Sequence, residues 1–157
     1  MEKFQITKEG YEKLKSQISN LKNVERPNII KQIATARELG DLKENAEYHS
    51  AKDKQGFIEA QIADLEEKFS RVEIVDISKL SGEQVKFGAT FDLEDLDSGK
   101  KVSYKIVNEI EADIDAGLIS SGSPVARAVI GKKVGDEVEI RTPGGVSNHE
   151  ILQVRFV

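Results

Sequence analysis

Two acidic residues, Asp41 and Glu44, lie three positions apart in the segment Gly40–Asn45. On a helix this spacing puts both side chains on one face, with Cβ atoms about 5–6 Å apart. Mg²⁺ in proteins typically takes one or two carboxylates and completes its octahedron with waters and substrate phosphates. Two exposed carboxylates are therefore suited to complete a Mg²⁺ site whose other ligands belong to a partner.

The same pair also matches a common helix start. In a capping box, Asp41 would cap the N-terminus of a helix and Glu44 would return to the cap. The spacing alone favours this structural role. The two roles are compatible, because Glu44 can cap in the free protein and turn outward on docking.

Basic residues flank the acidic pair. Arg37 lies about one turn before it and Lys52 about two turns after it. One interpretation is a solvated face of i, i+4 ion pairs, and the other is a strip that contacts phosphates. His49 and Asp53 are two potential zinc ligands without a third, so we do not predict a zinc site.

Two runs of helical periodicity surround the tip segment 40–45. Pro27 is expected to kink the first run without ending it, and Thr7 to cap its start. In each run the apolar residues recur mostly every three or four positions, and the narrow stripe that they form is typical of a coiled-coil seam. Gly40 is suited to end the first helix just after Leu39. We therefore predict an antiparallel hairpin with arms on the order of 45 Å. The apolar positions are Tyr11, Leu14, Ile18, Leu21, Ile30, Ile33 and Ala36 before the tip, and Tyr48, Ala51, Ile58, Ile62, Leu65, Phe69 and Val72 after it.

The pattern changes after Phe69, where alternation over 71–77 indicates strand. A short helix is expected over 123–131, with Ser123 as N-cap and Pro124 as its first residue. The fold class is thus α+β, with a coiled-coil hairpin over residues 1–76 and a small, mostly antiparallel sheet with one helix over 77–157. Further strands are expected over 84–87, 90–96, 102–107, 137–141 and 150–156, with turns at 97–100 and 142–145.

Composition narrows the class of protein. The formal charge of −5 and the pI near 5.2 argue against an autonomous DNA- or RNA-binding protein. The absence of cysteine excludes disulfides and thiolate metal sites. The chain begins without a signal-peptide pattern and has no apolar run of membrane-spanning length. We expect a soluble cytoplasmic protein.

The segment Gly40–His49 resembles the tip signature of the Gre family of bacterial transcript cleavage factors. Leu42-Lys43 and the absence of strongly basic arms favour its GreA branch over its GreB branch. The resemblance spans essentially the whole chain, because further motifs match in the family's order: Arg26-Pro27, Phe87–Ala89, Ile119-Ser120, Ser123–Ala128, Gly135–Val138 and Thr142–Gly145.

The resemblance implies a mechanism. The family binds RNA polymerase and inserts its coiled coil through the secondary channel. Asp41 and Glu44 would then help to hold the second Mg²⁺ and orient the attacking water, while polymerase cleaves the 3′ end of a backtracked transcript. The factor would be a monomer without enzymatic activity of its own.

The resemblance also implies two contact surfaces. The FKBP-like half, 77–157, would dock at the channel rim through Ser123, Pro124 and Arg127. Arg37 and Lys52 would form the basic patch that contacts the extruded RNA. Close relatives carry arginine where this chain has Lys52, so positive charge is kept but bidentate phosphate binding is not.

Three other functions remain open. A channel-binding inhibitor would need a different tip. A prolyl isomerase would use the FKBP-like half, although a fold does not imply an activity and its aromatics are scattered. In a chaperone-like coiled coil the tip charges would be incidental. Cleavage of a backtracked elongation complex with and without the protein separates these functions.

Overall fold

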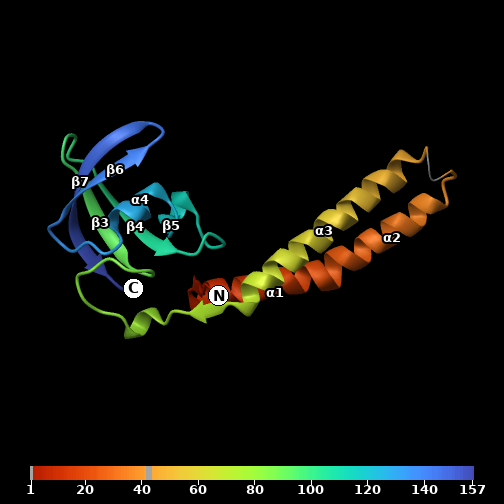
Figure 1. The fold of residues 1–157 in the computed structure, drawn as a ribbon, viewed down its shortest axis with the longest axis horizontal. Coiled ribbons are helices and arrows are strands. Elements are labelled where there is room, and N and C mark those ends of the chain that lie inside the picture. Colours follow the sequence, from red (N-terminus) through yellow and green to blue (C-terminus); the bar gives the residue numbers. More distant parts are fainter. Residues whose placement is uncertain (1, 42–43) are drawn as a thin grey trace. The chain divides into compact units, whose positions relative to one another are not determined.

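The computed structural model of the protein describes residues 2–41 and 44–157 (Figure 1). The chain divides into two compact units. The first contains the residues up to Phe4 together with Tyr11–Val72, and the second contains Gln5–Gly10 and Glu73–Val157. This division differs from the expected 1–76 and 77–157, because Gln5–Gly10 belongs to the second unit and the second unit resumes at Glu73.

The first arm of the hairpin is continuous through Pro27. It consists of α1 (Lys8–Asn20), a π-helical turn η1 (Leu21–Glu25) and α2 (Arg26–Arg37). Proline has no N–H to donate inside a helix, and the wider turn before it absorbs the defect: the Arg26 N–H donates to the Leu21 carbonyl. Thr7 is the expected cap, since the Gly10 N–H donates to its Oγ1 at 3.1 Å. The helix ends at Arg37, two residues earlier than expected.

The second arm is the single helix α3 (Ala46–Ser70), which runs antiparallel to α2 (Figure 1). Buried side chains form the seam between the arms, and burying each isoleucine contributes about 1.5–3 kcal/mol. At the other end of the hairpin, Tyr11 stacks on Phe69 with centroids 5.3 Å apart. The predicted helical hairpin is confirmed, although Ile29 lies in the seam and Ile30, expected there, is exposed. Its seam residues are Ile29, Ile33, Ala51, Ile58 and Ile62.

Ion pairs connect the arms across this seam. Arg26 donates through Nε and Nη2 to the two carboxylate oxygens of Glu59, both at 2.7 Å. The hydrogen bond from Arg26 lowers the pKa of Glu59. Lys22 Nζ contacts Glu66 Oε2 at 3.0 Å. These exposed pairs link the two helices at the surface beside the buried seam.

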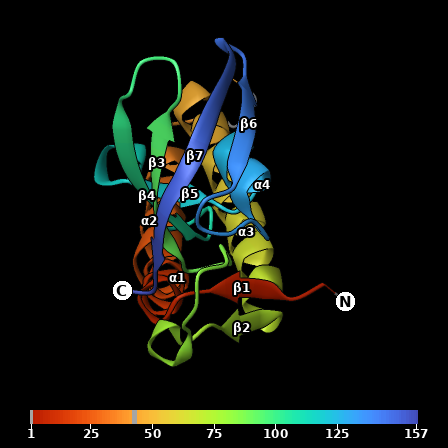
Figure 2. The same cartoon turned by 90° about the vertical axis from the view of Figure 1, so that its left-hand side faces the viewer.

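A two-stranded ribbon joins distant parts of the chain (Figure 2). In it, β1 (Phe4–Ile6) pairs with β2 (Val72–Ile74). The Val75 N–H then donates to the Ile6 carbonyl at 2.8 Å. Alternation over 71–77 predicted the second strand, whereas β1 is too short to stand out in the sequence.

The larger sheet has the strand order β5-β4-β3-β7-β6. Its pairs are antiparallel except β4–β5, which is parallel, so the expected mostly antiparallel sheet is confirmed. The expected strand over 84–87 is wrong, since only an isolated bridge joins Gln84 to Lys133. The strands are β3 (Thr90–Asp95), β4 (Lys101–Val107), β5 (Leu118–Ser120), β6 (Glu137–Thr142) and β7 (Gly145–Arg155).

One short helix, α4 (Pro124–Val129), covers the sheet (Figure 2). Its Ala126 and Val129 are fully buried among the sheet's apolar side chains, which include Phe91 and Ile151. Two 3₁₀ turns, Ile77–Lys79 (η2) and Ile114–Ala116 (η3), complete the unit. Among the described residues, no helix combines the length and apolar character needed to cross a membrane.

A buried polar cluster fixes the start of α1 within the second unit. The Glu111 carboxylate accepts hydrogen bonds from the Thr7 hydroxyl and from the Thr7 and Asn108 N–H groups. Asn108 also donates through Nδ2 to the Gln5 carbonyl at 2.8 Å. Gly10 packs directly against this carboxylate, and a Cβ there would overlap it.

Two glycine substitutions should therefore have opposite effects on stability. Gly10→Ala displaces the Glu111 carboxylate and deprives the buried Thr7 hydroxyl of its acceptor, which should cost about 1–3 kcal/mol. Gly56→Ala faces open space inside α3 and should stabilise by about 0.5–1 kcal/mol. Urea unfolding of both variants measures the difference; a Gly10→Ala protein as stable as wild type would contradict the account of the cluster.

Candidate functional site

The acidic pair lies in the connection between the two arms. Asp41 and Glu44 are both exposed, and both precede α3, which begins at Ala46. The i, i+3 helical geometry expected for their side chains therefore does not apply. Gly40 does not end α2 as expected, because Glu38 is the C-cap and Gly40 lies two residues beyond it; its φ of +128° is one that other residues rarely adopt. Leu42 and Lys43 lie outside the described residues.

Asn45, and not Asp41, caps α3. Its Oδ1 accepts from the Tyr48 N–H at 3.0 Å, and its Nδ2 donates to the Ala36 carbonyl at the end of α2. Asparagine caps about as well as aspartate, but only the amide also carries a donor for the opposite arm. The capping-box assignment of Asp41 and Glu44 is therefore wrong, and helix capping does not explain these two carboxylates.

The two basic residues lie on opposite arms. The Arg37 guanidinium stands 5.9 Å from the centroid of the Tyr48 ring, a cation–π distance across the hairpin. Lys52 Nζ donates to Gln55 Oε1 at 3.2 Å. Within 2–41 and 44–157, neither residue has an ion-pair partner. The interpretation as a face of i, i+4 pairs thus fails for Arg37 and Lys52.

The donor set at the tip fits a shared metal ion. Asp41 and Glu44 supply hard oxygen ligands, as Mg²⁺ prefers, and their exposure leaves them accessible to a partner. In the part of the chain that the structure describes, no cluster of three or more His, Cys, Asp or Glu residues could hold a metal. A Mg²⁺ ion held here would need further ligands from elsewhere.

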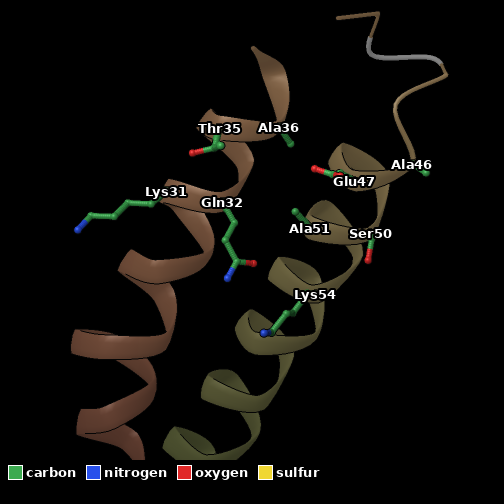
Figure 3. Close-up of a pocket in the computed structure, with 9 residues that line it drawn as sticks. All are labelled: Lys31, Gln32, Thr35, Ala36, Ala46, Glu47, Ser50, Ala51 and Lys54. Carbon is green, nitrogen blue, oxygen red and sulfur yellow. The ribbon is translucent and has the colours of Figure 1, made fainter. Parts of the chain in front are cut away.

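A groove opens between α2 and α3 next to the tip (Figure 3). Its volume is about 570 Å³, and the sequence analysis did not predict it. The sequence does contain a pattern that could have predicted the groove, because the seam positions change from isoleucine to alanine at Ala36 and Ala51. The lining residues are Lys31, Gln32, Thr35, Ala36, Ala46, Glu47, Ser50, Ala51 and Lys54.

The three predicted docking residues gather at the start of α4. The Ser123 Oγ accepts from the Ala126 N–H at 3.2 Å, so this hydroxyl caps the helix as expected. Pro124 and Arg127 line a shallow hollow of about 410 Å³ together with two residues of β6, Glu139 and Arg141. The sequence analysis missed these two residues, because only the folded sheet brings β6 to α4.

The chain matches family models and sequences of known proteins. Residues 4–74 match the family model "Transcription elongation factor, N-terminal", and residues 80–156 match "Transcription elongation factor, GreA/GreB, C-term". The chain is 56% identical to transcription elongation factor GreA of Phenylobacterium zucineum and 52% identical to that of Caulobacter vibrioides, over the full length of both proteins. A solved structure of GreA factor homolog 1 (Gfh1) from Thermus thermophilus is 30% identical, with a TM-score of 0.45, covering 98% of this chain and 99% of that one.

Replacing the cap should destabilise the hairpin more than replacing an acidic residue beside it. Asn45→Ala loses the α3 cap, which typically costs about 1 kcal/mol, and also loses the hydrogen bond from Nδ2 to the Ala36 carbonyl, which keeps the Leu39 N–H as a donor at 3.1 Å. Glu44→Ala removes an exposed side chain and should change stability by less than about 0.5 kcal/mol. Thermal unfolding followed by circular dichroism compares them. If the two variants lost equal stability, the assignment of Glu44 to a capping box would be supported after all.

Proposed function

Because the chain belongs to the GreA/GreB family of transcription elongation factors, we propose that it stimulates RNA polymerase to cleave the 3′ end of backtracked RNA. The hairpin enters the secondary channel of polymerase and brings its tip to the active centre. One observation carries this proposal: Asp41 and Glu44 are exposed at the tip, while Asn45 does the capping.

The tip carboxylates act as ligands of a Mg²⁺ ion that polymerase also binds. A second Mg²⁺ ion held there would supply stabilisation of the attacking and leaving oxygens of phosphodiester hydrolysis. Asp41 and Glu44 supply the carboxylate oxygens that raise the occupancy of the second position. Their remaining lone pairs accept a hydrogen bond from the attacking water and orient it.

The hairpin delivers these ligands into a narrow passage. The 25 residues of α3 give an arm about 38 Å long. The isoleucine seam and the cross-arm pair Arg26–Glu59 keep the two helices together along this length. Two helices side by side are narrow enough for a channel that excludes a globular domain.

Arg37 and Lys52 contact phosphates of the extruded RNA. Stacking on Tyr48 holds the Arg37 guanidinium beside the tip, where its planar fork can bind a phosphate through two hydrogen bonds. Lys52 offers a point charge instead, so its contact is electrostatic without fixed geometry.

The second unit, FKBP-like in the family, docks at the rim of the channel. Pro124 and Arg127 contribute contacts on the surface of α4, and Arg141 of β6 adds a second guanidinium beside them. Ser123 contributes by fixing the start of α4, since its hydroxyl is the helix cap. The factor works as a monomer in the cytoplasm, where bacterial RNA polymerase is found.

Neutral isosteres at the tip should separate cleavage from folding and binding. In Asp41→Asn and Glu44→Gln, stimulated cleavage should fall more than about 100-fold, since losing even a partner of a metal ligand typically costs about 10–100-fold. Unfolding temperature and competition with wild type for polymerase should stay nearly unchanged. Asp53→Asn, an exposed acid lower on α3, is the matched control and should cleave normally. If Asp41→Asn stimulates cleavage like wild type, the proposed mechanism is wrong.

The purified protein should not cleave free RNA in the presence of Mg²⁺, because its tip supplies only two carboxylate ligands. The measurement is a gel assay of end-labelled RNA with the protein alone, with polymerase alone and with both on a backtracked complex. Only the last should give rapid release of a 3′ fragment. Cleavage of free RNA that Asp41→Asn abolishes would instead make the protein a nuclease.

A further inference from the structure

The groove beside the tip results from a local change in the seam. Ile29, Ile33, Ile58 and Ile62 fill the space between the arms farther from the tip. Nearer the tip, Ala36 and Ala51 occupy buried positions on the two arms, and the helices leave a hollow that their methyl groups help to line (Figure 3).

Two lysines border the groove, and no carboxylate among the described residues pairs with either of them. Lys31 on α2 and Lys54 on α3 are exposed, and in the described part of the chain neither makes an ion pair or a side-chain hydrogen bond. Farther along the hairpin, by contrast, several cations are paired with carboxylates. These pairs are Lys22–Glu66, Arg26–Glu59, Lys68–Asp64 and Arg71–Glu67.

This lysine pair is separate from the surface assigned to RNA. At 3.6 residues per turn, Lys54 and Lys52 lie about 160° apart around α3. Neither Arg37 nor Lys52 lines the groove. One acidic residue, Glu47, lines it from the first turn of α3, so the positive charge is concentrated at the end of the groove away from the tip.

We propose that this groove is a docking site for an acidic segment of RNA polymerase, with an apolar side chain against the alanine floor and carboxylates on Lys31 and Lys54. The inference rests on the proposed function, because it identifies polymerase as the partner. Complementary charge of this kind orients a complex and excludes wrong partners. Because Glu47 would repel carboxylates at the end of the groove near the tip, the acidic part of the bound segment lies at the other end, beside the two lysines.

The lining favours a protein segment over nucleic acid. Grooves that bind single-stranded nucleic acid combine positive charge with aromatic rings on which bases stack. The nine lining residues include no aromatic ring. Alanine methyl groups with two lysines at one end suit an aliphatic side chain followed by a carboxylate.

The test measures affinity for core RNA polymerase free of nucleic acid, by competition with labelled wild type at two salt concentrations. Lys31→Glu/Lys54→Glu should bind at least about 10-fold more weakly, because it places like charges together. Ser50→Tyr fills the groove without changing charge and should also weaken binding. Glu47→Gln removes the opposing charge and should bind no more weakly than wild type. Lys15→Glu/Lys100→Glu, with the same net charge as the double groove variant, is the matched control.

The outcomes separate this inference from the proposed function. At saturating concentration the groove variants should stimulate cleavage at the wild-type rate, because their tip is intact. Binding of Lys31→Glu/Lys54→Glu equal to that of the control would overturn the docking site. A loss confined to complexes that contain RNA would overturn it as well, by making nucleic acid the occupant. If wild type itself does not bind polymerase, the proposed function fails first.

Discussion

The side chain of Asn45 makes the contact on which the tip depends. Its carbonyl oxygen caps α3 and its amide nitrogen holds the end of α2, so one residue closes the hairpin and starts the second helix. An aspartate at this position could cap but could not donate to the Ala36 carbonyl. Because Asn45 supplies the cap of α3, neither Asp41 nor Glu44 is its N-cap. In the proposed function, these two carboxylates bind a metal ion and a water molecule together with a partner.

The part of the hairpin far from the tip differs from the part next to the tip in packing and in charge pairing. Away from the tip, isoleucines fill the seam and cations pair with carboxylates, so this part offers little net charge to a partner. Next to the tip, alanines replace isoleucines and Lys31 and Lys54 are not paired within the described residues. We therefore propose that the hairpin's own contacts with polymerase and RNA lie on its last few turns next to the tip.

Periodicity was sufficient to predict the two arms, the main strands and the short helix capped by Ser123, because each depends on neighbours in sequence. The tip was harder. Asp-x-x-Glu and Asn45 both satisfy the rules for a helix start, and only the position of the Ala36 carbonyl on the other arm decides between them. The position of Pro27 predicted an interruption of the helical hydrogen bonds, but it did not predict the π-helical turn that accommodates the interruption. The three-residue strands β1 and β5, the Glu111 cluster and the hollow beside Arg141 depend on residues far apart in the chain, which local patterns do not report.

The central claim is that the tip carboxylates act by raising the occupancy of a metal ion. The most direct measurement is the Mg²⁺ dependence of 3′ cleavage in a backtracked complex, at saturating wild type and at saturating Asp41→Asn. The account predicts that the variant needs a higher Mg²⁺ concentration for half-maximal cleavage and that high Mg²⁺ partly restores its rate. An unchanged Mg²⁺ midpoint with a lower plateau would contradict the account, because the carboxylate would then act on the reaction without acting on metal binding.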